Sequence, residues 1–262
     1  MPSLEILILA AGIGSRLKAV IPKPWILING ISICVRMIRE VLKINPDRIL
    51  VRCDPAYNGK IESIPKVVCL PKTGKLLRDI LDGVTQSGAD LLVVVNVDAV
   101  LLSSNLIHKI IKLAEMNSET GLIWPAVPRE KCYSEQGSFR YIPGSTLVRG
   151  GIWIIRPKLL HIDKQLLERM IKFPAISELF VMRLEGVVRF LLHWALHFPL
   201  KWFPRFQRFE PLAPRHIANL LGYALGCKAE IVEVNDPEVA FDIDLPPDLP
   251  EAIARLKMQG RY

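Results

Sequence analysis

The sequence predicts an α/β protein with a mostly parallel, Rossmann-like central sheet. Short apolar runs typical of strands alternate with segments whose apolar residues recur at helical spacing. The most apolar run, Leu91–Val97, is rich in valine, as expected for a central strand covered on both faces. A chain of 262 residues, half of them hydrophobic, can bury one sizeable core with an elaboration. We therefore expect one domain over residues 1–262.

The expected elements follow one another along the chain with short connections. The strands are expected at Leu4–Leu9, Ile49–Cys53, Lys66–Leu70, Leu91–Val97, Thr120–Trp124 and Ala229–Val234. The helices are expected at Ile31–Ile44, Leu76–Val84, Ile107–Met116 and Leu249–Met258, the last capped by Asp248. In such a fold ligands bind beyond the carboxyl ends of the strands, so the residues that follow each strand are the candidate site residues.

A glycine-rich loop follows the first strand. The strand end and the loop comprise Leu9, Ala10, Ala11, Gly12, Gly14, Ser15 and Arg16. Small residues let a phosphate approach backbone N–H groups, and Ser15 is expected to cap a helix whose N-terminus favours anions. Arg16 offers a fork of donors for phosphate, and Lys23, between two prolines, adds a second cation. The stretch predicts a polyphosphate site.

Two common glycine-rich motifs fit this loop less well. A dinucleotide-binding fingerprint would need a third glycine, and a phosphate loop would need Gly-Lys-Ser/Thr. A purely structural turn is the remaining alternative. The longer pattern, Leu9-Ala-Ala-Gly-x-Gly-Ser-Arg16 with Pro22-Lys23-Pro24, resembles the signature of MobA-like guanylyltransferases and sugar-phosphate nucleotidylyltransferases.

The resemblance implies a nucleotidyltransferase that moves an NMP group from an NTP to a phosphorylated acceptor with the help of Mg²⁺. It makes the loop residues nucleotide-binding and Arg16, Lys23 and Asp98 catalytic. Asp98 ends the central strand, where a carboxylate can hold Mg²⁺; a capping role is its alternative. The segment Asp242-Ile-Asp244-Leu-Pro-Pro-Asp248 resembles the family's ending, so Asp242 or Asp244 is expected to share the metal with Asp98.

Two further loops enter through the resemblance. Lys72, Thr73 and Gly74 follow the third strand, where the family holds base and ribose, although an ordinary turn explains them equally well. Arg149, Gly150 and Gly151 resemble the glycine pair beside the family's acceptor. Gly-Gly turns are common, so this signal is weak. The acceptor stays open between a sugar phosphate, a pterin cofactor and a lipid-head-group phosphate, and the base is not indicated.

Residues 160–227 read as a helical insertion outside the resemblance. A polar stripe of Arg189, His193, His197 and Lys201 is followed by a basic-aromatic run to Phe209. Recurring charges and prolines argue against a membrane span. The run is expected to pack on the core or in a homodimer, or to touch an anionic membrane surface peripherally. His193 and His197 lack a third ligand, so a metal pair is disfavoured.

Composition limits the remaining choices. Lysine and arginine exceed the acids by 34 − 26 = 8, which suits an anionic substrate, a nucleic acid or an acidic membrane, and no nucleic-acid motif accompanies the charge. Five scattered cysteines indicate reduced thiols in a cytoplasmic protein and no zinc site, and no leader is recognised. A non-catalytic nucleotide-binding or membrane-associated adaptor is the alternative function, disfavoured because both carboxylate segments are present.

Overall fold

The computed structural model describes residues 2–12, 14–19, 21–133, 141–142, 145–162 and 214–262. Its main sheet has the order β10-β7-β9-β6-β1-β4-β5, and β8 pairs with β7. The strands are β1 (Leu4–Leu9), β4 (Arg48–Cys53), β5 (Val67–Pro71), β6 (Leu91–Asn96), β7 (Leu122–Pro128), β8 (Leu147–Arg149), β9 (Ile152–Ile155) and β10 (Ala229–Glu233). The pairings of β8 and β9 are antiparallel and the others in this sheet are parallel, so the predicted mostly parallel sheet is confirmed.

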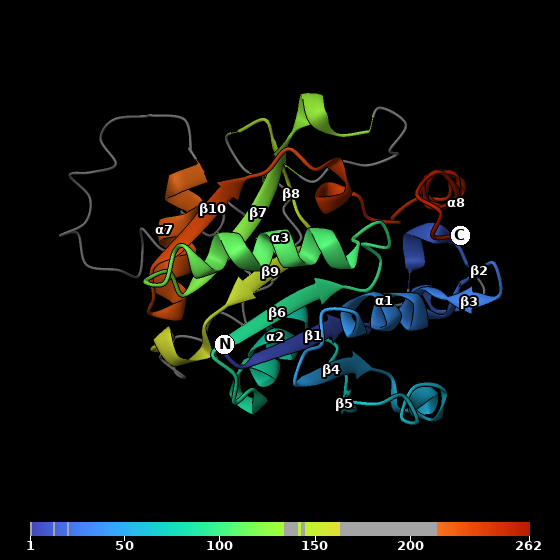
Figure 1. The fold of residues 1–262 in the computed structure, drawn as a ribbon, viewed down its shortest axis with the longest axis horizontal. Coiled ribbons are helices and arrows are strands. Elements are labelled where there is room, and N and C mark those ends of the chain that lie inside the picture. Colours follow the sequence, from blue (N-terminus) through green and yellow to red (C-terminus); the bar gives the residue numbers. More distant parts are fainter. Residues whose placement is uncertain (1, 13, 20, 134–140, 143–144, 163–213) are drawn as a thin grey trace.

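Helices cover both faces of the sheet (Figure 1). One face packs against α1 (Ile33–Leu42), α3 (Ser104–Glu115) and α8 (Asp248–Met258), and the other against α2 (Leu76–Gln86) and α7 (Pro214–Leu225). Side chains alternate along β1: Ile6 and Ile8 join the first core, Leu7 and Leu9 the second. The apolar run of the first strand therefore serves two cores at once.

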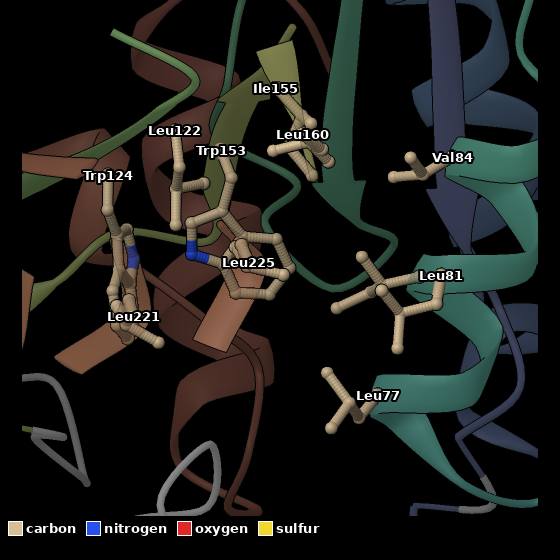
Figure 2. Close-up of a pocket in the computed structure, with 11 residues that line it drawn as sticks. Leu77, Leu81, Val84, Leu122, Trp124, Trp153, Ile155, Leu160, Leu221 and Leu225 are labelled. Atoms are coloured by element: carbon tan, nitrogen blue, oxygen red, sulfur yellow. The ribbon is translucent and has the colours of Figure 1, made fainter. Parts of the chain in front are cut away.

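The second face keeps a small apolar cavity (Figure 2). Its volume is about 30 Å³, and leucines of α2 and α7 line it together with Trp153 and Trp124 of the sheet. Every lining residue is apolar. A cavity of this kind stays dry, because a water inside would find no set of hydrogen-bond partners.

A hairpin replaces the start of the helix predicted over Ile31–Ile44. Strand β2 (Leu27–Ile28) pairs antiparallel with β3 (Ile31–Ser32) around Asn29-Gly30, whose φ angles are 49° and 72°. Both residues lie in the left-handed region that a two-residue hairpin requires, and Asn-Gly is its usual sequence. The helix then begins at Ile33, with the Ser32 hydroxyl accepting the Val35 N–H at 3.2 Å.

The other boundaries shift by a few residues. Strand β7 continues through Pro125 to Pro128, beyond the predicted end at Trp124. Helix α7 confirms helical structure in the last part of the predicted insertion. The polar stripe, the histidine pair and the basic-aromatic run lie outside the described residues. Within the described part of the chain, no helix is long and apolar enough to cross a membrane.

Candidate active site

Lys23 is the centre of a buried charge cluster at the carboxyl edge of the sheet. Its ammonium lies 2.6 Å from Asp98 Oδ2 and 3.0 Å from Asp244 Oδ1. Only about a tenth of the lysine side chain is exposed. Burial disfavours the charged ammonium, but the carboxylates of Asp98 and Asp244 outweigh it, and the pKa of Lys23 is raised above its ordinary value. The cluster therefore keeps the lysine charged at neutral pH.

The glycine loop lies directly against this lysine. A Cβ on Gly14, whose φ is 69°, would stand 2.9 Å from Lys23 Cβ, so only glycine lets the two segments meet. Gly12 has open space where its Cβ would be. Arg16 lies at the rim with half of its side chain exposed, 3.6 Å from Asp244 Oδ2. Arg16 and Lys23 thus both face Asp244, and the glycine loop meets Lys23 at Gly14.

The predicted helix after Ser15 is absent from the described residues. Ser15–Leu17 forms a single 3-10 turn, and Lys18 follows with φ 50°. A residue in the left-handed region cannot continue a right-handed helix, and Pro22 follows closely. An anion here therefore meets no helix dipole, only loop N–H groups and side chains.

Asp98 and the segment Asp242–Asp244 are joined through the main chain. The Ile243 N–H donates to the Asp98 carbonyl at 3.3 Å, and Ile243 itself is fully buried. Asp242 and Asp244 flank it and are both buried. Asp98 follows β6, whereas the other two precede α8, so a main-chain hydrogen bond joins segments far apart in the sequence. The structure thus brings together Asp98 and Asp244 around Lys23, and Asp242 lies two positions before Asp244; their role as metal ligands stays a prediction.

Gly150 and Gly151 are packed closely against other parts of this chain. A Cβ on Gly151 would stand 2.8 Å from Asp242 Oδ1 and 2.9 Å from Ala99 Cβ, and one on Gly150 would stand 2.6 Å from the Pro125 carbonyl. The space at both glycines is thus filled by this chain, and an acceptor site beside them stays a prediction. Arg149 lies in β8 with only 6% of its surface exposed, and its predicted contact with an acceptor stays a prediction.

The predicted base and ribose loop, which comprises Lys72, Thr73 and Gly74, lies beyond the edge strand β5. Lys72 pairs with Asp54 at 2.6 Å, and the Thr73 N–H donates to Asp79 Oδ1 at 2.8 Å. Gly74, with φ 79°, has open space at its Cβ position. The backbone of this loop is thus fixed by α2, and its outer surface is free for a ligand.

Arg52 and Asp79 support this loop and were not among the predicted site residues. Arg52 is 2% exposed; it lies 3.6 Å from Asp79 Oδ1 and donates to the Pro71 carbonyl at 2.6 Å. The sequence does indicate that Arg52 is buried with a partner, because an arginine inside the apolar strand Ile49–Cys53 must pair with a polar group when it is buried. Asp54, directly after the same strand, carried no signal of its own.

Asp248 has a different role from the predicted one. Helix α8 begins at Asp248, its N-cap is Pro247, and the N-cap offers no side-chain hydrogen bond. The Asp248 carboxylate instead accepts the N–H groups of Asp244 (2.9 Å) and Leu245 (2.7 Å). It orders the loop that carries Asp244.

The cysteines take no part in the site. All five are free, and burial raises the pKa of each thiol, to about 12 for Cys34 and Cys53. Among the described residues, no group of three or more histidines, cysteines and acids could hold a metal ion by itself. Any metal at the carboxylates of the cluster would need further ligands from a substrate.

A family model described as a MobA-like NTP transferase domain matches residues 6–209. The match covers the glycine loop, Lys23 and Asp98. It also runs through residues 160–209, which we expected to lie outside the resemblance, and it ends before Asp242. The similarity of the Asp242–Asp248 segment to the family's ending is therefore not part of this match.

Solved structures share the fold. A hypothetical transferase from Thermus thermophilus superposes with a TM-score of 0.65 at 17% identity, covering 94% of this chain and 99% of its own. A 4-diphosphocytidyl-2C-methyl-D-erythritol synthase from Anaerococcus prevotii gives 0.58 at 12% identity, covering 97% and 98%. At such identities the likeness concerns the fold alone.

One curated relative is similar in sequence over a short stretch. A probable UDP-N-acetylglucosamine pyrophosphorylase of Acanthamoeba polyphaga mimivirus is 44% identical over 55 residues, 21% of this chain. The match spans 22% of the relative's length.

Proposed function

Because this chain belongs to the MobA-like NTP transferase family, we propose that it transfers an NMP group from a nucleoside triphosphate to a phosphorylated acceptor and releases pyrophosphate. One observation carries the proposal beyond the family: Lys23 lies between Asp98 and Asp244, in contact with Gly14 of the glycine loop. A nucleotide-binding adaptor would need the loop, but it would not need a buried lysine held between two carboxylates.

The chemistry suits this set of groups. An acceptor phosphate is already ionised at neutral pH, so its oxygen can attack the α-phosphorus without a general base. A new phosphorus–oxygen bond forms at the α-phosphorus as the bond to the bridging oxygen of the β-phosphate breaks. Loop N–H groups and Arg16 would hold the β- and γ-phosphates, and Lys23 would meet the charge at the α-phosphate.

The nucleotide would place its base and ribose toward Lys72, Thr73 and Gly74. This loop follows β5, two strands from β1 in the sheet, and its main chain is held by Asp79. Lys72 is paired with Asp54 at a half-exposed position, where a ribose hydroxyl or a base can exchange with either partner. The loop therefore fits a neutral, polar part of the substrate.

The residues present fit a magnesium ion that arrives with the nucleotide. Formal charges of Lys23, Arg16 and the three aspartates sum to +2 − 3 = −1, which would repel a triphosphate without a further cation. Mg²⁺ commonly takes one or two protein carboxylates and completes its shell with phosphates and water. Asp98, with Asp242 or Asp244, would hold it, and the ion would neutralise phosphate charge there.

The partners follow from the same proposal. The acceptor is a sugar phosphate, a pterin cofactor or a lipid-head-group phosphate, and all three offer the same nucleophilic phosphate oxygen. A homodimer and peripheral contact with an anionic membrane remain predictions that rest on residues 163–213, outside the described part of the chain. We place the enzyme in the cytoplasm on the scattered, free cysteines.

A pyrophosphate-release screen tests the proposal. Each of the four NTPs is combined with Mg²⁺ and with each of the three acceptor classes separately, and we expect release with one base and one class. Asp98→Asn should abolish this release while thermal unfolding and NTP binding without metal stay near wild type. Release in none of the combinations, or full activity of Asp98→Asn, would contradict the proposal.

A further inference from the structure

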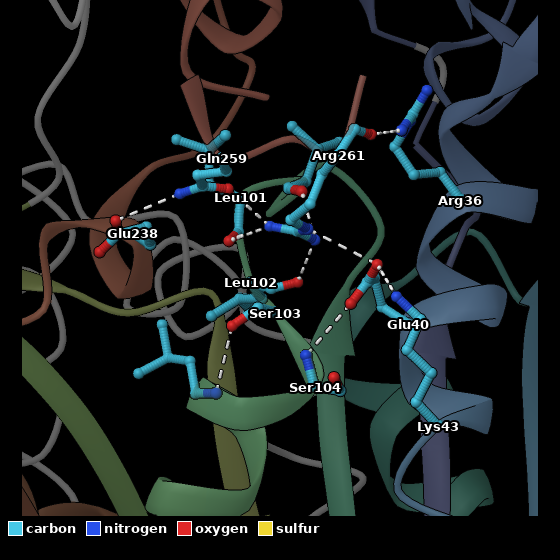
Figure 3. A network of polar contacts seen from close by, with 12 residues as sticks. Arg36, Glu40, Lys43, Leu101, Leu102, Ser103, Ser104, Glu238, Gln259 and Arg261 are labelled. Carbon is cyan, nitrogen blue, oxygen red and sulfur yellow. Dashed lines mark hydrogen bonds and ion pairs between the residues drawn. The ribbon is translucent and has the colours of Figure 1, made fainter. Parts of the chain in front are cut away.

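The loop between β6 and α3, which carries Asp98, points three successive carbonyls at one guanidinium (Figure 3). Arg261 donates to the carbonyls of Leu101 and Leu102 at 2.8 Å and of Val100 at 3.4 Å. These three side chains are buried, so the loop is largely closed to water. Buried carbonyls need partners, and Arg261 meets three of them with one fork of donors.

Arg261 is itself fixed from several sides. Its Nε lies 3.5 Å from Glu40 Oε1 of α1, and Arg36 of the same helix donates to the Arg261 carbonyl. Glu40 also accepts the Ser104 N–H, at the start of α3, at 3.2 Å. Burial disfavours the charge of Glu40, but Lys43, Arg261 and Ser104 outweigh it and lower its pKa. The Arg261 guanidinium is therefore held in place between α1 and the loop that carries Asp98.

The N-terminal end of α8 fixes the segment that carries Asp244, the second carboxylate bound to Lys23. Asp248, the first residue of α8, is fully buried and accepts the N–H groups of Asp244 and Leu245. Arg261 lies three residues after the last residue of α8. A helix of 11 residues spans about 16 Å, and the Arg261 N–H donates to the Leu256 carbonyl at 2.8 Å, so α8 and the turn after it together reach both loops. The Ile243 N–H, which donates to the Asp98 carbonyl, joins the two loops between these ends.

We propose that α8 is a brace for the active site, and that Arg261 and Asp248 are positioning residues that set where Asp98 and Asp244 stand relative to Lys23. Neither residue is expected to touch a substrate. Arg261 acts through the carbonyls after Asp98, and Asp248 acts through the N–H groups at Asp244. The catalytic part of this inference rests on the proposed nucleotidyl transfer; the positioning part does not.

If Arg261 and Asp248 were merely structural, replacing them would lower the stability of the protein without displacing the Asp98 and Asp244 carboxylates. Positioning predicts a defined pattern instead. Turnover should fall because the carboxylates are misplaced. The KM for NTP should change little, because Arg261 is bound to the loop after Asp98 and to α1, whereas the triphosphate is expected on the glycine loop. Groups that support ligating residues typically contribute 10- to 100-fold to activity, which is the range expected here.

The test compares Arg261→Ala and Arg261→Lys with Arg255→Ala as the matched control. Arg255 lies in the last turns of α8, but it pairs with Glu251 at 2.6 Å and stacks on Tyr133. We expect Arg261→Ala to lower kcat by about 10- to 100-fold. The kcat of Arg261→Lys should lie between those of wild type and Arg261→Ala, since one ammonium cannot donate to three carbonyls at once. The kcat of Arg255→Ala should match that of wild type.

Amide hydrogen exchange of the free protein gives a readout that needs no activity. Arg261→Ala should speed exchange at the Ile243 and Leu102 N–H groups at least tenfold, while Val94 in the middle of β6 stays protected; Asp248→Asn should speed exchange at Asp244 and Leu245. Unchanged exchange in both variants, or a wild-type kcat in Arg261→Ala, would overturn the brace. An inactive wild type with the predicted exchange pattern would overturn the proposed function and leave the brace standing.

Discussion

Two buried cations lie at the same edge of the sheet, and each faces two carboxylates. Lys23 is held by Asp98 and Asp244, and Arg52 by Asp79 and Asp82. Arg52 also donates to main-chain carbonyls, whereas the Lys23 ammonium donates to the oxygens of its two carboxylates. A carboxylate can exchange one cation for another, but a peptide carbonyl inside the fold has no such freedom. Arg52 therefore supports the fold, whereas Lys23 can change partners.

The largest effect is expected for Arg52→Ala. It would leave the 4%-exposed Asp79 without its cation, and breaking a buried pair in this way typically costs about 3–5 kcal/mol of unfolding free energy. Urea denaturation measures the loss. A change below about 1 kcal/mol, the value of an exposed pair, would show that Arg52 is no more structural than a surface arginine.

Lys23→Ala is expected to act first on turnover. Removing one donor that meets developing charge lowers kcat by about 10²- to 10³-fold, while NTP affinity falls far less. Steady-state kinetics and calorimetric NTP titration separate the two quantities. Equal losses in kcat and affinity would make Lys23 an ordinary binding residue.

Divalent cations should then distinguish the carboxylates around Lys23 from those around Arg52. In Lys23→Ala the carboxylates of Asp98 and Asp244 lose their lysine, and a bound Mg²⁺ or Ca²⁺ should replace it. At a hundred times its Kd such an ion would stabilise the variant by about 2.7 kcal/mol. Thermal unfolding with and without the ion measures this gain, and Arg52→Ala, which should gain nothing comparable, is the control. Equal gains would remove the difference drawn between the two cations.

The smallest effect concerns pH. The folded-state pKa of Lys23 is raised, so its contribution to stability is fully present below the unfolded value near 10.5 and is lost only as pH rises through the folded value. The difference in unfolding free energy between wild type and Lys23→Met should therefore stay constant from about pH 7 to about pH 10. A decline within that window would mean that the carboxylates do not hold the ammonium as described.

The strands and the residues in short motifs could be predicted from the sequence, because neighbouring residues largely determine them. The short apolar runs of β1, β4 and β6 indicate strands, because a strand covered by helices on both faces buries consecutive side chains on alternate sides. Lys23 and Asp98 could be predicted because each belongs to a short motif. The hairpin at Asn29-Gly30 had a readable signal, yet the helical spacing after Ile31 obscured it.

Long-range placement could not be predicted from the sequence. The antiparallel β9 enters between β6 and β7, and apolar spacing does not indicate strand order or direction. The role of Gly151 depends on Asp242, which lies 91 positions later in the chain. Arg261 looks like an ordinary charged residue after a helix until its contact with Leu101, 160 positions earlier, is known.

Three of the five thiols are buried, two are half-buried and all have raised pKa values, which makes this protein a convenient scaffold for site-specific labelling. With a pKa of about 11, as at Cys132 and Cys227, only about one thiol in ten thousand is ionised at neutral pH, so alkylating dyes react slowly. A single cysteine placed at the exposed Lys75, beside the loop proposed to hold the base, would carry a fluorophore almost alone. Its emission would report nucleotide arrival in real time, before any product forms.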